Sequence, residues 1–219
     1  MRMADDVIEG PTFALTKEWV DPSPGIELVE VHYVWGPLGE PPDWEGDQTA
    51  VATPLDAGPP PRRAAPLELP RFVDGATDYL LHYYYYFFFV AGGGAQGSTP
   101  VFTEQIGTRE VRYDDPGNRY TNVGVAWTVG ESRDPNYSVA ALDGLAFSGA
   151  DDLVGPGTFT PIFEFVQAVP PPHVFRGRVW GVKGQPVTHV FHLVRLGSPS
   201  GDDAERWDDN DGKGWQLTI

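Results

Sequence analysis

Two tryptophans near the C-terminus, Trp207 and Trp215, enclose a run of short polar residues, and this arrangement suits the binding of a sugar. A pyranose ring has an apolar C–H face that stacks on an indole plane, whereas its hydroxyl groups need carboxylates, amides and a cation within hydrogen-bond reach. Asp209, Asn210 and Lys213 supply these groups between the two indoles. We therefore take these five residues as one candidate ligand-binding site.

A structural interpretation of the same segment stays open. Asp, Asn and Gly form tight turns, so residues 207–215 also suit a solvated hairpin whose two indoles pack against a sheet edge. Asp208 and Asp211 offer oxygen ligands of the kind that calcium prefers, but their spacing does not follow the EF-hand loop. Calcium is therefore an alternative to a plain acidic surface run, and no other cofactor is predicted.

The segment also resembles the closing motif of starch- and glycogen-binding β-sandwich modules, Trp-Asp-Asn-Asn-x-Gly-Lys-Asn-Tyr. The resemblance covers about the last 50 residues, with an echo in the first half of the chain, and it implies a non-catalytic module that binds an α-glucan. Asp209 and Gly214 replace asparagines of that motif and Trp215 replaces its tyrosine, which removes two amides that would bind sugar hydroxyls. The matching positions are Trp207, Asp208, Asn210, Gly212 and Lys213.

Two pairs of similar segments indicate an internal repeat. The pairs are VWGPLGEP at residues 34–41 with VWGVKGQP at 179–186, and VRYDDPGNRYTNV at 111–123 with ERWDDNDGKGWQLTI at 205–219. We therefore predict that the chain is built from two related halves, about residues 27–125 and 158–219.

The repeat extends the candidate ligand-binding residues, because Trp35 and Trp180 both occupy the repeated VWG segment. Alternation along a strand places Trp180 on the polar face of Arg176 and Arg178, as a stacking platform requires. The same count groups Trp35 with apolar residues and favours its burial. The first-half counterpart of the C-terminal segment supplies a second candidate site, which consists of Tyr113, Asp115 and Tyr120.

The elements that position these residues are predicted to be β-strands, because β-branched and aromatic runs alternate with Gly, Pro, Asn and Asp. The most apolar run is the aromatic segment of residues 78–90, which predicts a central strand covered on both faces. The pattern predicts an all-β fold, an antiparallel, immunoglobulin-like β-sandwich with pseudo-repeated halves. The expected strands are residues 12–19, 27–35, 78–90, 100–113, 120–129, 158–168, 173–181, 186–196 and 214–219.

The predicted organisation is a single domain, residues 1–219, with two tandem β modules as the alternative. No segment between the halves reads as a linker. Residues 41–70 are rich in proline and show no clear periodicity, so we expect a long loop there.

Composition and charge exclude several classes of function. The formal net charge of −16 repels phosphate backbones, so nucleic acid and anionic membranes are not expected as partners. The chain has no cysteine, which excludes disulfides and a thiol nucleophile. Neither a signal peptide nor an apolar membrane span is visible, which predicts a cytoplasmic protein.

The sequence thus favours a non-catalytic protein that binds a polysaccharide or oligosaccharide through exposed tryptophans. Motifs for a nucleophile elbow, a zinc site or a phosphate loop are missing, but an enzyme is not excluded. One alternative is a structural protein whose aromatic strands make subunit contacts, as in a homo-oligomer. The other is an enzyme with an aromatic-lined cavity formed by His82, Tyr83, Tyr85 and His192.

Overall fold

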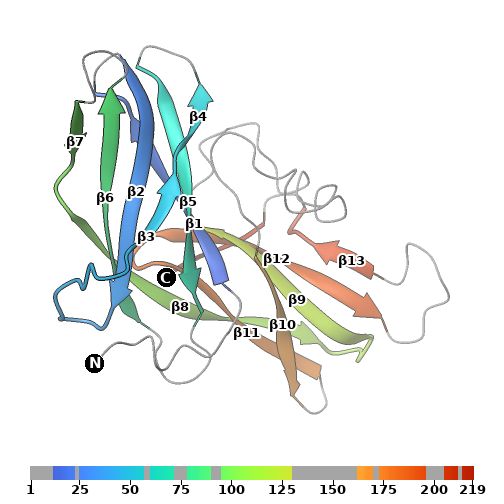
Figure 1. The fold of residues 1–219 in the computed structure, drawn as a ribbon. Coiled ribbons are helices and arrows are strands. Elements are labelled where there is room, and N and C mark those ends of the chain that lie inside the picture. The colour runs from blue at the N-terminus through green and yellow to red at the C-terminus, as the bar shows by residue number, and fades with distance from the viewer. Residues whose placement is uncertain are drawn as a thin grey trace. The chain divides into compact units, whose positions relative to one another are not determined.

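The computed structural model shows a chain built from antiparallel β-strands (Figure 1). It describes residues 12–22, 25–56, 60–71, 78–89, 95–129, 162–169, 173–195, 205–211 and 214–219. Every regular element within these ranges is a strand, and each strand predicted from the sequence is present. The prediction of an all-β fold with antiparallel sheets is therefore confirmed, while the immunoglobulin-like topology and the pseudo-repeat stay predictions.

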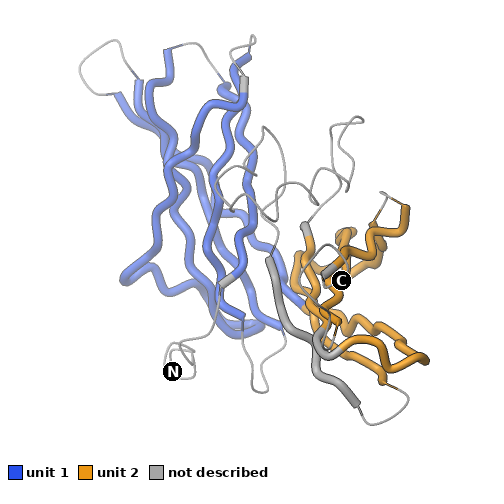
Figure 2. Tube along the Cα trace, turned by 90° about the vertical axis from the view of Figure 1, so that its right-hand side faces the viewer, with its two compact units in different colours: residues 1–107 blue, residues 108–219 orange. Residues whose placement is uncertain are grey.

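The chain divides into two compact units, Met1–Gly107 (unit 1) and Thr108–Ile219 (unit 2), which Figure 2 colours separately. The boundary lies inside one strand, because β8 (Phe102–Asp115) contributes residues to both units. Whether the chain is one domain of two halves or two tandem modules stays a prediction.

Unit 1 contains two antiparallel sheets. The first has the strand order β1 (Thr12–Val20), β5 (Arg62–Pro70) and β4 (Thr53–Asp56). The second has the order β8, β6 (Tyr79–Phe89), β2 (Ile26–Gly36) and β3 (Gln48–Val51), and β7 (Gln96–Ser98) also pairs with β6.

The two sheets of unit 1 face each other across an apolar core. Alternate side chains of each sheet point inward, as the two-residue period of a strand dictates. Hydroxyl groups add polar contacts between the layers: Tyr85 Oη donates to the carbonyl of Glu18 at 2.8 Å, and Tyr33 Oη accepts from the backbone N–H of Glu68 at 3.2 Å. The inward residues include Val29, Val31, Leu67, Leu69, Tyr79 and Leu81, all fully buried.

The expected loop over residues 41–70 is wrong, since β3, β4 and β5 occupy much of it. Strand β5 alternates after all: Ala65, Leu67 and Leu69 are buried, whereas Pro66 and Glu68 are exposed. Pro66 is tolerated because β4 pairs only with residues 62–64 of β5, so no described strand needs a backbone N–H from Pro66 on that side. The prolines obscured a period-two pattern that was present in the sequence.

The aromatic strand β6 is covered best over its first part. On the inner face Tyr79, Leu81, Tyr83 and Tyr85 are buried but Phe87 and Phe89 are partly exposed, and on the outer face His82 is buried whereas the rings from residue 84 onward are partly exposed. The prediction of a strand covered on each side therefore fits residues 79–83 better than residues 84–89.

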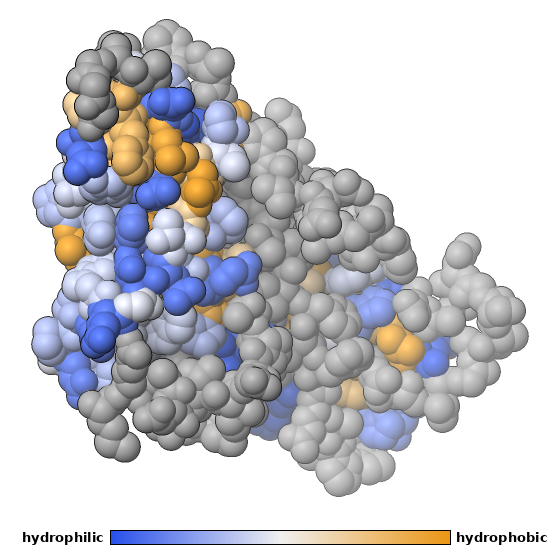
Figure 3. Space-filling view, in the orientation of Figure 1, coloured by the Kyte–Doolittle hydropathy of each residue, from blue (hydrophilic) through white to orange (hydrophobic). Residues whose placement is uncertain are grey.

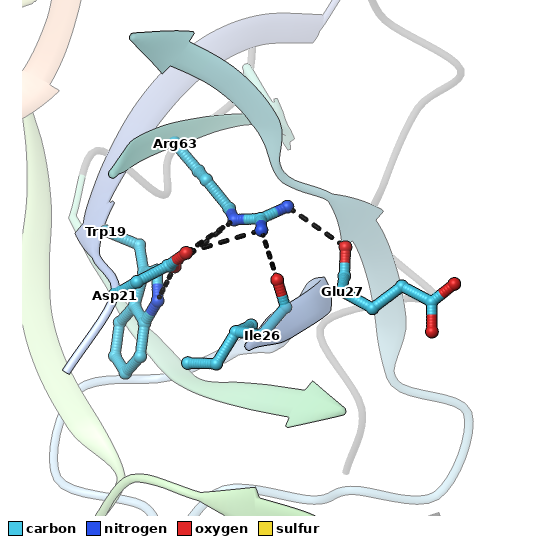
Figure 4. A network of polar contacts seen from close by, with 5 residues as sticks. All are labelled: Trp19, Asp21, Ile26, Glu27 and Arg63. Atoms are coloured by element: carbon cyan, nitrogen blue, oxygen red, sulfur yellow. Dashed lines mark hydrogen bonds and ion pairs between the residues drawn. The ribbon is translucent and has the colours of Figure 1, made fainter. Parts of the chain in front are cut away.

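A largely covered arginine, Arg63 of β5, holds the start of β2 against the first sheet of unit 1 (Figure 4). The Arg63 guanidinium lies 3.2–3.3 Å from both oxygens of Asp21 and donates to the carbonyls of Ile26 at 2.8 Å and Glu27 at 3.2 Å. Trp19 Nε1 donates to the same carboxylate at 2.9 Å. This network satisfies a carboxylate whose side chain is only 3% exposed.

Unit 2 is a single curled sheet. Its order is β13 (Glu205–Asp208), β12 (Pro186–Arg195), β9 (Tyr120–Val129), β10 (Ile162–Val169), β11 (His173–Val182) and the later part of β8, and β14 (Trp215–Thr218) also pairs with β12. Strands β8 and β12 are far apart in this order, yet the rings of Tyr113 and Phe191 lie 5.1 Å apart. Arg109 Nε also donates to the carbonyl of Thr218 at 3.0 Å. The sheet therefore bends back on itself around a core.

Candidate functional site

The two tryptophans of the predicted site project from opposite faces of the sheet. Trp207 on β13 lies opposite His192 of β12, and Trp215 on β14 lies opposite His189 of the same strand. Directly paired residues share a face, and positions 189 and 192 differ by an odd number. The register therefore separates the two indoles, and the single site predicted from the sequence is not formed.

Trp207 packs against the sheet. Its ring lies 4.8 Å from the His192 ring at an interplanar angle of 35°, and the side chain is partly buried. The structural interpretation of this tryptophan therefore fits better than a sugar platform.

The polar residues between the tryptophans form a turn. The backbone N–H of Gly214 donates to the carbonyl of Asp209 at 2.7 Å, and Asn210 Nδ2 donates to the carbonyl of Gly214 at 3.1 Å. Asn210 and Asp211 have φ angles of 55° and 57°, a conformation that Asn and Asp adopt more readily than most residues. The amide of Asn210 thus closes the loop, while Lys213 lies outside the described residues.

Trp215 is the exposed member of the pair, with 41% of its surface accessible. Its face of the edge also carries Asp208, opposite Phe191, because residues 189 and 191 of β12 point the same way. Arg206, two residues before Asp208 on β13, lies on the same face. An indole, a carboxylate and a guanidinium therefore line one edge of unit 2.

The second predicted site lies beside this edge. Tyr113 on β8 has its ring 6.1 Å from that of Tyr120, and the Arg206 guanidinium lies 5.6 Å from the Tyr120 ring centre. Burial raises the pKa of the Tyr113 phenol, the Asp208 charge raises it further, and a hydrogen bond from Arg206 lowers it. Tyr113 is therefore close to both Arg206 and Asp208, and the structure joins parts of the two predicted sites.

We call this group the edge site: Arg206, Asp208, Trp215, Tyr113 and Tyr120. The sequence interpretation missed Arg206 because it assigned the ligand-binding role to the adjacent Trp207. The signal that finds it is alternation along β13, since Arg206 and Asp208 share a face that excludes Trp207. The approach of Tyr113 depends on the curl of the sheet, which the sequence does not show.

Asp115 belongs to the turn between β8 and β9 rather than to a ligand site. Its carboxylate is fully buried, with Oδ2 accepting the backbone N–H of Tyr120 at 2.8 Å. Its carbonyl accepts the N–H of Asn118 at 3.1 Å. These bonds close the turn, and Arg119 Nε lies 3.6 Å from the other carboxylate oxygen.

Neither tryptophan of the VWG segments is part of the edge site. Trp180 is 2% exposed, so its prediction as a stacking platform is wrong. Arg176 and Arg178 are exposed as expected, but residues 179–181 are all buried because β11 is covered on both faces at that end. Trp35 belongs to unit 1, where its partly exposed ring lies 6.3 Å from the Tyr33 ring.

The remaining candidates are the calcium ligands and the residues of the catalytic cavity. Among the described residues, no group of three or more His, Asp or Glu is arranged to hold a metal ion, so calcium at Asp208 and Asp211 stays a prediction. Of the residues named for a catalytic cavity, the hydroxyl of Tyr83 donates to Glu104 at 3.0 Å and His82 Nδ1 lies 2.9 Å from Thr103 Oγ1. These contacts are consistent with packing inside unit 1.

Comparison of the chain with protein-family models, with curated proteins and with solved structures yielded no match. In the part of the chain that the structure describes, no helix is long and apolar enough to cross a membrane. The function is therefore argued from the geometry of the edge site.

Proposed function

We propose that the protein is a non-catalytic carbohydrate-binding protein whose edge site takes a neutral, α-glucan-like chain. The observation that supports this most is the exposed indole of Trp215 on the same sheet face as the Asp208 carboxylate. An accessible aromatic plane beside a charged acceptor matches the two surfaces of a pyranose ring.

Each residue of the edge site has a distinct part in this proposal. Trp215 stacks on the C–H face of a sugar, Asp208 accepts hydrogen bonds from hydroxyl groups, and the Arg206 guanidinium donates to them. Tyr113, which is partly exposed, extends the aromatic surface next to Arg206, whereas Tyr120 is only 3% exposed and packs against the Tyr113 ring from the core. With its raised pKa, the Tyr113 phenol stays protonated at neutral pH.

The edge site lies beside a strand that packs in the core of unit 2, so its residues lose little conformational entropy when a sugar binds. His189 and Phe191, which lie opposite Trp215 and Asp208, are 7% and 4% exposed and belong to the core of unit 2. A single short sugar makes few contacts at such an edge, so we expect weak binding to oligosaccharides. A polymer that engages several sites gains affinity through effective concentration.

Paired tryptophan variants test this proposal. We expect Trp215→Ala to weaken retention in gels that contain soluble starch by about fivefold or more, because an aromatic contact contributes on the order of 1 kcal/mol beyond the apolar area that it buries. Trp207→Ala is the matched control on the opposite face and should change retention by less than about twofold. Electrophoretic retention is independent of tryptophan fluorescence, so the loss of one fluorophore does not affect it.

Two outcomes contradict the proposal. One is a wild-type protein whose mobility no neutral glucan slows. The other is an equal loss of retention in both variants, which would trace the effect to folding rather than to the face of Trp215.

A further inference from the structure

A second aromatic surface lies in unit 1, on the side of β2, β3 and β6 that faces away from the opposing sheet. Val31 and Tyr85 pair on the inner face, so their neighbours His32 and Tyr84, which also pair, lie on the outer one. Tyr86 follows Tyr84 on that face. We call this surface the outer face of unit 1: Glu30, His32, Trp44, Asp47, Tyr84 and Tyr86.

The rings of the outer face are held in a fixed arrangement. The His32 ring is parallel to that of Tyr84, with centres 5.0 Å apart and an interplanar angle of 6°, and it is edge-on to Tyr86 at 5.9 Å. Trp44 lies edge-on to Tyr84 at 5.1 Å. All of these side chains are partly exposed, so the cluster is ordered but accessible.

Two carboxylates anchor the imidazole at the centre of the cluster. Asp47 Oδ2 lies 2.7 Å from His32 Nδ1, and Glu30 Oε2 lies 3.5 Å from Nε2. Burial raises the pKa of the Tyr84 phenol and the Asp47 charge adds to the increase. The face therefore combines neutral aromatic rings with fixed negative charge.

The unit 1 part of the sheet that carries this face has no Lys or Arg among its described residues. Neither Lys nor Arg occurs in the described segments 25–56, 78–89 and 95–107, whereas residues 40–47 alone contain four acids. The basic residues described in unit 1 lie on β1 or β5 or directly after them, and three of them form ion pairs there: Lys17 with Glu104, Arg62 with Glu18, and Arg63 with Asp21. Apart from the His32 imidazole, which contacts Glu30 and Asp47, the described unit 1 part of this sheet therefore offers no basic counterpart to the acids of the outer face.

The space-filling view agrees with a mixed surface (Figure 3). Hydrophilic side chains cover most of unit 1 on the side shown, and apolar side chains gather towards the top of the picture, where β6 ends. Among the strands of the outer face, Val51 of β3 is 51% exposed and pairs with Glu30 of β2. Apolar and acidic groups are therefore adjacent on this side of the sheet.

We propose that the outer face of unit 1 docks a basic segment of a partner protein, a stretch of chain that presents Lys or Arg side chains. Ammonium and guanidinium groups bind over aromatic ring faces by cation–π attraction, and Glu30 and Asp47 add charge complementarity. Aromatic residues are also enriched at the centres of protein interfaces. An anionic partner is disfavoured by the same charges. A neutral sugar is the rival occupant.

The test uses a fluorescent oligo-lysine peptide and the full chain at low and physiological salt. We expect measurable binding that weakens with salt, and a loss of about threefold to fivefold in Tyr86→Ala, since this partly exposed ring would contribute one cation–π contact. The double variant Glu30→Gln/Asp47→Asn should show a similar loss. Circular dichroism checks that each variant keeps its strand content.

The matched control removes the same net charge elsewhere. Glu110→Gln/Asp114→Asn neutralises two exposed acids of unit 2, which are 57% and 59% accessible, and should change the affinity by less than about twofold. Equal weakening by both double variants would reduce the effect to long-range attraction by the −16 net charge and overturn the proposal. Binding of oligo-glutamate, or displacement of the peptide by a neutral glucan, would overturn it as well.

Discussion

At the scale of single residues, the difference between Trp207 and Trp215 shows what local sequence can and cannot predict. Both sit beside turn-forming residues, and composition alone gave them the same role. Their faces are set by pairing with His192 and His189 of another strand. That register depends on tertiary structure, so the sequence correctly indicated an exposed indole but could not say which one.

The Arg63–Asp21 pair should be one of the costliest polar contacts to remove. Arg63→Ala leaves a buried carboxylate without its guanidinium, so we expect a loss of about 3 kcal/mol in the free energy of unfolding. Arg63→Lys should lose less, because it keeps the charge but not the forked geometry. Urea unfolding measures both values.

The control for this prediction is the exposed pair Arg112–Asp114, whose Nε–Oδ1 distance is 2.8 Å. Its side chains are 53% and 59% accessible, so Arg112→Ala should cost less than about 1 kcal/mol. If Arg63→Ala and Arg112→Ala lose similar amounts of unfolding free energy, burial does not determine how much an ion pair stabilises this protein.

His189 should make the protein sensitive to mild acid. Burial lowers the pKa of its imidazole from 6.5 to about 4, so between these pH values the unfolded chain binds a proton that the folded chain does not. Stability is therefore fully present above pH 6.5 and falls as the pH drops towards 4, at up to roughly 1.4 kcal/mol per pH unit. Thermal unfolding of wild type and His189→Phe from pH 8 to pH 5 measures this.

The substitution is expected to flatten the pH dependence in that window, because the phenyl ring cannot bind a proton. If wild type and His189→Phe lose stability equally as the pH falls, a buried neutral histidine at this position is contradicted.

At the scale of elements, strand β12 organises the candidate site. It pairs with β9 on one side and with both β13 and β14 on the other, so it fixes the directions of Arg206, Asp208 and Trp215 together. Its apolar run was recognised in the sequence as a strand. Of its two edge partners, β14 was predicted as residues 214–219, whereas the four-residue β13 was missed.

The turn that leads into β12 should depend on Gly184. The residue has a φ of +81°, and the N–H of Gln185 donates to the carbonyl of Val182 at 3.0 Å across the turn. Nothing lies within 4 Å of an added Cβ, so Gly184→Ala tests backbone strain alone and should cost about 1 kcal/mol of unfolding free energy.

Gly36→Ala is the matched control for this turn. Gly36 also has open space around an added Cβ, but its φ is not in the left-handed region. Alanine there should be neutral or slightly stabilising, because it restricts the unfolded chain. If chemical denaturation gives equal losses for the two variants, the turn geometry assigned to Gly184 is wrong.

At the scale of the whole molecule, the sequence predicted the fold class better than its organisation. Aromatic and β-branched runs gave the long strands, including β2, β6, β9 and β12. The division between the units falls between Gly107 and Thr108, within β8, where no change of composition signals a boundary. Charge is also distributed unevenly, since no Lys or Arg occurs in residues 25–56, 78–89 and 95–107 of unit 1, whereas Arg206 lies at the edge site of unit 2.

The proposed functions therefore use different chemistry in each unit: a neutral sugar at the edge site and a basic chain at the outer face. The central claim is that Trp215, and not Trp207, meets the sugar. It is tested most directly by assigning the indole N–H signals of the seven tryptophans in a proton–nitrogen correlation spectrum and adding a soluble α-glucan oligosaccharide. We predict that the Trp215 signal shifts with saturation while that of Trp207 stays in place; a stationary Trp215 signal at saturating sugar would contradict the account.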